Sequence, residues 1–197
     1  MRKLQGRFAA ILFLLFLVWL SVASAQDTTR VAGRERYDIE RYLNIRGATA
    51  PTLSPAGDRI AFLTSITGTP QVWMVGAEGG WPEQLTFYAD RVDLVKWSPD
   101  GSGLVFAKSR GGDENAQLFW LSPDGSKVRQ LTDIPKVRHD FSAWSHDGKK
   151  ISFASNERNR DLFDVYVMDV ASGKRELVYQ QDGTNRPIAW SVDIQAL

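Results

Sequence analysis

Short apolar runs alternate with polar turns through most of the sequence. From residue 50 onward the runs are rich in β-branched and aromatic residues, and apolar and polar positions alternate within them. Gly, Asp, Asn and Ser bound the runs, and no helical period of useful length interrupts them. The pattern predicts an all-β chain built from short strands.

One tight turn recurs at a nearly constant spacing. Its clearest copy is Trp97-Ser98-Pro99-Asp100-Gly101, and related turns begin at Ser54, Ser145 and Ser191, so neighbouring serines are 44, 47 and 46 residues apart. In such a turn Pro presets φ, Asp bonds to nearby backbone and Gly accepts a positive φ. Ser122-Pro123-Asp124-Gly125 occurs out of phase, so the turn by itself carries little weight. The turn together with its period predicts a repeat architecture.

Four strands follow in the same order in each repeat, and the first of them ends at the turn. The second strands are Ile60-Ala61-Phe62-Leu63, Leu104-Val105-Phe106-Ala107 and Ile151-Ser152-Phe153-Ala154. The third strands are Gln71-Val72-Trp73-Met74-Val75, Gln117-Leu118-Phe119-Trp120-Leu121 and Asp164-Val165-Tyr166-Val167-Met168. The fourth strands are Gln84-Leu85-Thr86, Gln130-Leu131-Thr132 and Glu176-Leu177-Val178.

Four antiparallel strands in about 40–50 residues correspond to one blade of a β-propeller. The predicted fold is therefore an all-β, incomplete β-propeller of four-stranded antiparallel blades. A β-sandwich is the alternative, since it also uses short strands and regular turns, but it does not require a constant spacing.

Three complete blades are expected, near residues 50–89, 90–136 and 137–182, within a partial propeller over residues 50–197. A fourth opens in residues 183–197 with the strand Pro187-Ile188-Ala189-Trp190-Ser191. Propellers close with about four to eight blades, so three blades and one strand leave two apolar faces open. We expect either that the natural protein continues into the remaining blades, or that copies of the chain associate through these faces.

The first 25 residues have the composition of a secretory signal peptide. Arg2, Lys3 and Arg7 precede an apolar run of 13 residues (8–20), and Ala23-Ser24-Ala25 offers a cleavage site. The run is short for a membrane span, although an uncleaved N-terminal anchor is the alternative. We predict a helical signal peptide over residues 1–25, a leader over 26–49, and an exported periplasmic or extracellular bacterial protein. Membrane contact is expected only through the signal peptide.

Composition narrows the possible chemistry. The 24 Lys and Arg nearly balance the 23 Asp and Glu, and no basic patch suggests a nucleic-acid partner. The absence of cysteine excludes disulfides, thiolate zinc sites and a cysteine nucleophile. Two histidines leave little room for a histidine-based metal cluster. We predict no cofactor, no metal site and no catalytic residue.

Several polar residues are candidates for a site, but their context favours a structural role. Asp90 and Asp93 flank Arg91 in what reads as a solvated loop. Residues 111–115 lack the alternating oxygen ligands of a calcium hand and read as a hairpin connection, as residues 156–161 also do.

Both histidines fall inside the repeats and are interpreted as solvated or edge residues. His146 takes the turn position that Pro99 occupies one repeat earlier. His139 lies on the approach to a strand, five residues before Trp144. Neither position favours catalysis.

The repeats resemble the Tol-B-like and WD-like propeller repeats of exported bacterial proteins. The resemblance covers about residues 50–191. It is carried by Trp97-Ser98-Pro99-Asp100-Gly101, Leu104-Val105-Phe106-Ala107, Gln130-Leu131-Thr132 and Asp164-Val165-Tyr166-Val167-Met168-Asp169.

Other stretches resemble the start of bacterial prolyl-oligopeptidase-family serine peptidases of the dipeptidyl or acylaminoacyl type. They are Tyr42-Leu43-Asn44-Ile45-Arg46, Ala50-Pro51-Thr52-Leu53-Ser54-Pro55, Gly80-Trp81-Pro82-Glu83-Gln84-Leu85-Thr86 and Gly111-Gly112-Asp113-Glu114-Asn115. The resemblance implies an N-terminal propeller that covers a C-terminal α/β-hydrolase domain. Such a propeller restricts access, so that short peptides reach the serine and folded proteins do not.

The sequence departs from that family where the chemistry would lie. The Gly-x-Ser-x-Gly elbow of the hydrolase domain is absent, and Gly101-Ser102-Gly103 is too short and sits in a hairpin. We expect the chain to be inactive alone, with its hydrolase domain missing and peptide substrates belonging to the full-length protein. One alternative is a non-catalytic periplasmic Tol-B-like propeller that binds protein partners. Another is a decayed or prematurely stopped gene product.

Overall fold

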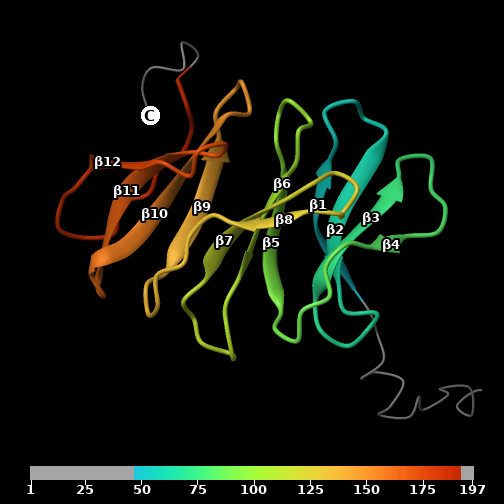
Figure 1. Ribbon diagram of the computed structural model, residues 1–197, viewed down its shortest axis with the longest axis horizontal. Coiled ribbons are helices and arrows are strands. Elements are labelled where there is room, and N and C mark those ends of the chain that lie inside the picture. Colours follow the sequence, from blue (N-terminus) through green and yellow to red (C-terminus); the bar gives the residue numbers. More distant parts are fainter. Residues whose placement is uncertain (1–46, 192–197) are drawn as a thin grey trace, which may run out of the picture. The chain divides into compact units, whose positions relative to one another are not determined.

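The computed structural model describes residues 47–191, which form β-strands and no helix (Figure 1). The strands make three four-stranded antiparallel sheets, and each sheet uses four strands that are consecutive in the sequence. A sandwich would place the strands in two packed sheets, whereas this is one sheet per repeat. The predicted all-β fold of four-stranded propeller blades is confirmed.

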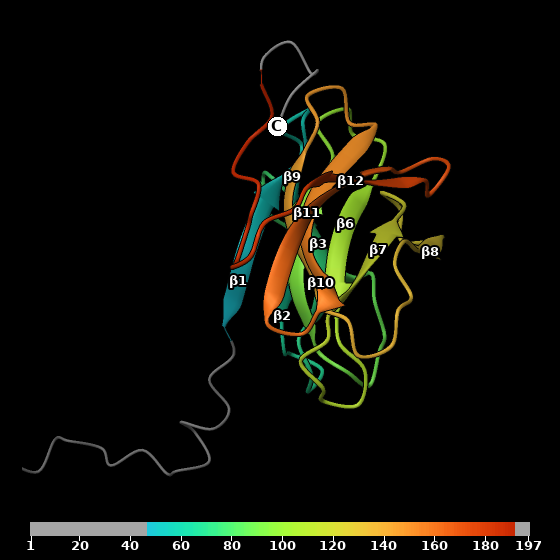
Figure 2. The ribbon, with the colours of Figure 1, turned by 90° about the vertical axis from the view of Figure 1, so that its left-hand side faces the viewer.

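Within each sheet every strand pairs with the next one along the chain, so hairpins connect the strands of a sheet. The first sheet contains β1 (Ala48–Leu53), β2 (Arg59–Thr64), β3 (Gln71–Gly76) and β4 (Glu83–Gln84). The second contains β5 (Val92–Trp97), β6 (Leu104–Lys108), β7 (Gln117–Leu121) and β8 (Val128–Gln130). The third contains β9 (His139–Trp144), β10 (Lys150–Asn159), β11 (Leu162–Asp169) and β12 (Arg175–Tyr179). Figure 2 shows this third sheet nearest the viewer.

In each of the three sheets, the serine of the repeated turn is buried and closes the turn with two hydrogen bonds. In the second sheet, the Ser98 amide donates to the Gly103 carbonyl (2.9 Å) and the Gly103 amide donates to Ser98 Oγ (3.1 Å). The same pair of bonds joins Ser54 to Arg59, Ser145 to Lys150 and, out of phase, Ser122 to Lys127. Serine is therefore selected because its hydroxyl satisfies a backbone N–H that the hairpin would otherwise leave unpaired.

Two apolar cores fill the spaces between successive sheets. In β6, Leu104 and Phe106 belong to the core shared with the first sheet, whereas Val105 and Ala107 belong to the core shared with the third. This alternation is the two-residue period of a strand that is buried on both faces. The second sheet is thus a blade held from both sides.

Equivalent turns of successive sheets lie against each other. A Cβ on Gly148 would lie 2.4 Å from Cγ of Asp100, and a Cβ on Gly101 would lie 3.9 Å from the Pro55 ring. Both glycines have a positive φ, of 71° and 74°. The repeat period therefore places the turns in a row along one end of the sheets.

The structure differs from the expected first strand of a fourth blade, because residues 187–191 form no strand. A strand needs a partner with which to exchange backbone hydrogen bonds, and no strand follows β12 within residues 47–191. The segment still lies beside the third sheet, where Trp190 Nε1 donates to the Ala143 carbonyl at 3.4 Å. The β5 strand makes a comparable contact two repeats earlier, where the Trp97 amide donates to Thr52 Oγ1 at 3.3 Å.

The predicted signal peptide (1–25), most of the leader (26–46) and residues 192–197 lie outside the described residues. No helix with the length and apolar character needed to cross a membrane occurs within residues 47–191.

Candidate functional site

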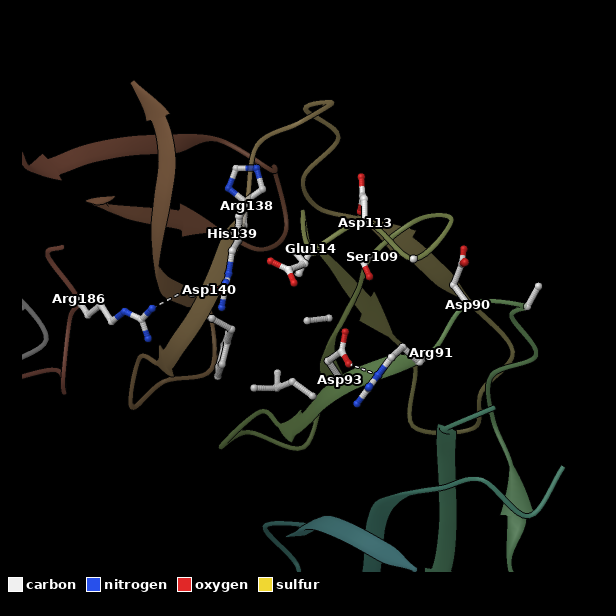
Figure 3. Close-up of a pocket in the computed structure, with 16 residues that line it drawn as sticks. Asp90, Arg91, Asp93, Ser109, Asp113, Glu114, Arg138, His139, Asp140 and Arg186 are labelled. Atoms are coloured by element: carbon white, nitrogen blue, oxygen red, sulfur yellow. Dashed lines mark hydrogen bonds and ion pairs between the residues drawn. The ribbon is translucent and has the colours of Figure 1, made fainter. Parts of the chain in front are cut away.

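A cavity of about 830 Å³ opens where the second and third sheets meet (Figure 3). Its walls come from the crossover that leads into β5, the hairpin between β6 and β7, the beginning of β9, and Arg186. All of these lie at the end of the sheets opposite the repeated serine turns. Its volume falls in the range of about 300–1,000 Å³ that is usual for ligand pockets.

The crossover into β5 is held by a glutamine and a threonine. Gln71 Nε2 donates to the carbonyls of Tyr88 (2.9 Å) and Asp90 (3.0 Å). Thr86 Oγ1 donates to Gln71 Oε1 (2.9 Å) and accepts from the Val72 amide (2.8 Å). Because Gln71 and Thr86 are both buried, these bonds fix the path of the chain at the edge of the cavity.

The crossover into β9 uses the same device one repeat later. Gln117 Nε2 donates to the carbonyls of Val137 (2.7 Å) and Ile134 (3.2 Å), and the Leu118 amide donates to Thr132 Oγ1 (2.9 Å). The Gln-Leu-Thr stretches were predicted as complete fourth strands, but only their glutamines are in strands. The threonine turns back to the third strand, and this tertiary hydrogen bond overrides the local preference for an extended strand.

Two arginine–aspartate pairs stand at equivalent positions of their repeats and line the cavity. Arg91 Nε lies 2.5 Å from Asp93 Oδ1, and Arg138 Nε lies 2.7 Å from Asp140 Oδ1. Arg186 Nη2 adds a third contact, 2.9 Å from Asp140 Oδ2. Figure 3 shows these two groups on different walls of the cavity. The sequence contains this arrangement as a repeated Arg-x-Asp, a pattern that is visible only when the repeats are aligned.

The remaining carboxylates of the cavity differ in their partners. Asp90 accepts from the Gly111 amide (2.9 Å) and lies 3.6 Å from Lys108 Nζ, so it ties the crossover to the hairpin instead of standing in a solvated loop. Asp113 accepts from the Asn115 side chain (3.2 Å), the first of several hydrogen bonds that lower the pKa of this carboxyl. Glu114 lines the cavity, and no hydrogen bond or ion pair within residues 47–191 engages its side chain.

The hairpin formed by residues 111–115 is therefore organised by Asp113 as a turn, in keeping with its interpretation as a connection. Within the described part of the chain, no three histidine or carboxylate side chains gather in a way that could hold a metal ion.

The structure corrects the interpretation of His139 as a solvated or edge residue. His139 begins β9 but is completely buried, with its ring edge-on to Phe153 at 5.6 Å. Burial, assisted by the charge of Arg175, lowers the pKa of His139 to about 4. Neither ring nitrogen has a hydrogen-bond partner among residues 47–191. His139 is thus a neutral core residue, and its alternation with Phe141 on one strand was the signal that could have shown it.

His146 is exposed in its turn and forms no hydrogen bond within the described residues. A catalytic triad needs a histidine that bonds to both a nucleophile and a carboxylate. Neither histidine meets that condition in residues 47–191.

The predicted loop at residues 156–161 lies mostly within a longer hairpin, because β10 continues to Asn159. Arg158 Nε lies 2.8 Å from Asp164 Oδ2, and Arg158 Nη1 lies 3.0 Å from Asp182 Oδ1. Asp164 is 1% exposed, so its ion pair with Arg158 is well shielded from water. This pairing anchors the chain after β12, and with it the segment that carries Arg186.

No family model matches the sequence. YuxL of Bacillus subtilis, named an uncharacterized peptidase, is 29% identical over 159 residues, which is 78% of this chain and 22% of YuxL. Dipeptidyl aminopeptidase BIII of Pseudoxanthomonas mexicana is 25% identical over 166 residues, which is 81% of this chain and 24% of that protein. The chain is therefore related to bacterial peptidases over most of its length, and it spans about a quarter of theirs.

A structure assigned to TolB from Agrobacterium tumefaciens has the same fold. The two are 26% identical with a TM-score of 0.58, over 70% of this chain and 50% of that one. The three sheets are thus the blades of a TolB-like propeller.

Proposed function

We propose that this chain is part of the substrate-gating propeller of an exported serine peptidase of the prolyl-oligopeptidase type. The observation that carries the proposal is the match of 78% and 81% of the chain to two peptidases that are about four times longer. Such a length leaves room for a hydrolase domain beside the propeller. The sequence resemblance to dipeptidyl and acylaminoacyl peptidases supports the same assignment.

A stack of rigid blades suits a gate. The described blades are joined by two continuous apolar cores, so they move as a unit and not strand by strand. The polar cavity lies at the end of the blades, at the beginning of the first strands β5 and β9. A passage beside these strands admits an extended peptide and turns away a folded protein.

Catalysis is assigned to a hydrolase domain that these residues do not contain. Purified chain, all 197 residues, is expected to release no chromophore from dipeptidyl or acyl-aminoacyl p-nitroanilides. The positive control is the longer polypeptide that is obtained when translation continues in frame past the codon for Leu197. Hydrolysis by the 197-residue chain alone would refute the assignment of catalysis to a separate hydrolase domain.

The proposed location is outside the cytoplasm of a bacterium. It follows from the basic, apolar and small-residue order of residues 1–25. Cell fractionation with mass spectrometry of the N-terminus is expected to find the mature chain beginning at Gln26. Recovery of an intact N-terminus in the cytoplasm contradicts it.

A second function is a non-catalytic propeller that binds protein partners, and the likeness to the TolB structure favours it. The coding sequence after Leu197 separates the two. A Gly-x-Ser-x-Gly elbow in the frame supports the peptidase, whereas further blades followed by a stop codon support the binder. In either case we propose that remaining blades, or a second copy of the chain, cover the outer faces of the first and third sheets. Sedimentation of the purified chain tests the second copy, because a monodisperse monomer excludes it.

A further inference from the structure

One wall of the cavity holds more positive charge than its carboxylates balance. Arg138 and Arg186 both bind Asp140, at 2.7 Å and 2.9 Å, so two guanidinium groups share one carboxylate. The equivalent position of the second sheet holds Arg91 and Asp93 in a one-to-one pair. The repeat itself therefore provides a neutral reference for the Arg138–Asp140–Arg186 group, which carries one excess positive charge in a cavity also lined by Asp90, Asp113 and Glu114.

The two arginines keep donors available. Arg138 uses Nε and Arg186 uses Nη2 toward Asp140, and their other guanidinium N–H groups make no hydrogen bond within residues 47–191. Both side chains are about half exposed, at 43% and 54%, and both line the cavity. A planar guanidinium has five donors in a fork that matches a carboxylate. The two arginines can thus bind the carboxylate of a ligand while they keep their ion pairs with Asp140.

The wall is also held in place before any ligand arrives. The Arg138 amide donates to Asn156 Oδ1 at 2.7 Å. The Asn185 amide donates to the Phe163 carbonyl at 3.0 Å, and the Arg186 guanidinium lies 5.8 Å from the centre of the Phe163 ring. Groups that are positioned in advance lose less freedom on binding, which favours affinity.

The geometry points to a carboxylate-binding site formed by Arg138 and Arg186, which takes the carboxylate of a short peptide. A cavity of about 830 Å³ has room for a few residues of such a peptide beyond the carboxylate. The unpaired carboxylate of Glu114 also lines the cavity, so a ligand with a second negative charge near it is disfavoured. The site does not depend on the proposed peptidase, because it uses residues of this chain alone.

Isothermal titration of the 197-residue chain with N-acetyl-trialanine tests the site, since that peptide carries a carboxylate and no amine. Saturable binding is expected, and the C-terminal amide of the same peptide should bind at least about tenfold more weakly because it lacks the charge. Arg138→Gln and Arg186→Gln should each weaken binding by about tenfold or more. Arg91→Gln is the matched control, because it removes an arginine from a different wall and leaves the Arg138–Asp140–Arg186 group intact, and it should weaken binding by much less than about tenfold.

The source of the carboxylate is settled by a third peptide, N-acetyl-Ala-Asp-Ala amide, whose only charge is on a side chain. Equal binding of this peptide supports the site and extends it to acidic side chains; weaker binding assigns it to the peptide C-terminus. Circular dichroism verifies that each variant keeps its β-sheet. If Arg138→Gln unfolds, Arg186→Gln and Arg186→Lys still test the site. Lysine keeps the charge without the fork of donors, so the affinity of Arg186→Lys should lie between those of the unmodified chain and Arg186→Gln. Equal binding of acid and amide, or an equal loss in Arg91→Gln, overturns the proposal whatever the peptidase assay shows.

Discussion

Phe106 is the largest fully buried side chain in the core shared by the first two blades. It is completely buried, stacks on Phe119 at 5.0 Å with an angle of 12° between the rings, and lies 5.9 Å from the ring of Tyr88. Removing a buried phenylalanine to alanine costs about 3–5 kcal/mol, because transfer energy is lost and a cavity remains. Phe106→Leu keeps most of the volume and should cost roughly 1–1.5 kcal/mol. The difference between the variants measures the ring contact and the cavity together.

Urea unfolding followed by tryptophan fluorescence and circular dichroism measures both variants. Natural domains are stable by about 5–15 kcal/mol, so Phe106→Ala removes a large share of the total. Phe87→Ala is the matched control, since Phe87 is 78% exposed on the crossover, and it should change stability by less than about 0.5 kcal/mol. A cost below about 1 kcal/mol for Phe106→Ala, with the midpoint of Phe87→Ala shifted equally, would refute the packing of these blades.

Three further predictions concern the devices that shape the blades. Thr132→Val removes the oxygen that accepts from the buried Leu118 amide, and it should cost roughly 1–3 kcal/mol in urea unfolding; a neutral effect would contradict the role given to the Gln-Leu-Thr stretch. Gly148→Ala should destabilise more than Gly173→Ala, although both have φ near 70°, because only the first brings a Cβ to 2.4 Å from Asp100, whose carboxylate is held by Ser102. Equal melting temperatures for the Gly148→Ala and Gly173→Ala variants would show that the neighbouring turns are not in contact. Hydrogen bonds to Asp124, first from the Ser122 hydroxyl and then from Ser126, lower its pKa from 3.8 to about 2. A lowered pKa stabilises the fold above the unfolded value, so this contribution is full above pH 3.8 and is lost as pH falls toward about 2. Asp124→Asn should flatten that part of the curve of stability against pH, and an unchanged curve would show that the turn does not hold the carboxylate.

The repeated turn predicted the sheets well because its function is local. Ser98, Asp100 and Gly101 interact within a few residues of each other, so the sequence pattern contains nearly all of the physics. The unbroken apolar run Leu104-Val105-Phe106-Ala107 likewise suits a strand buried on both faces, and the structure places its residues alternately in the two cores.

The cavity could be predicted only in part. Arg91-Val92-Asp93 and Arg138-His139-Asp140 occupy equivalent places of the repeat, so their pairing was available to an alignment of the repeats. The contact of Arg186 with Asp140 was not, because it joins residues 46 positions apart through a crossover whose path is set by tertiary hydrogen bonds. His139 was misread for a related reason: a strand position faces the core or the solvent according to how the sheets pack, and a turn signal does not encode that choice.

The most direct test of the proposed function compares two polypeptides from the same gene region in one peptidase assay. One is the 197-residue chain, and the other is the product read in frame beyond Leu197. The account predicts hydrolysis of a dipeptidyl p-nitroanilide by the longer product alone, with the activity lost when the serine of its Gly-x-Ser-x-Gly elbow is replaced by alanine. Hydrolysis by the 197-residue chain, or a longer product that adds only blades, would contradict it.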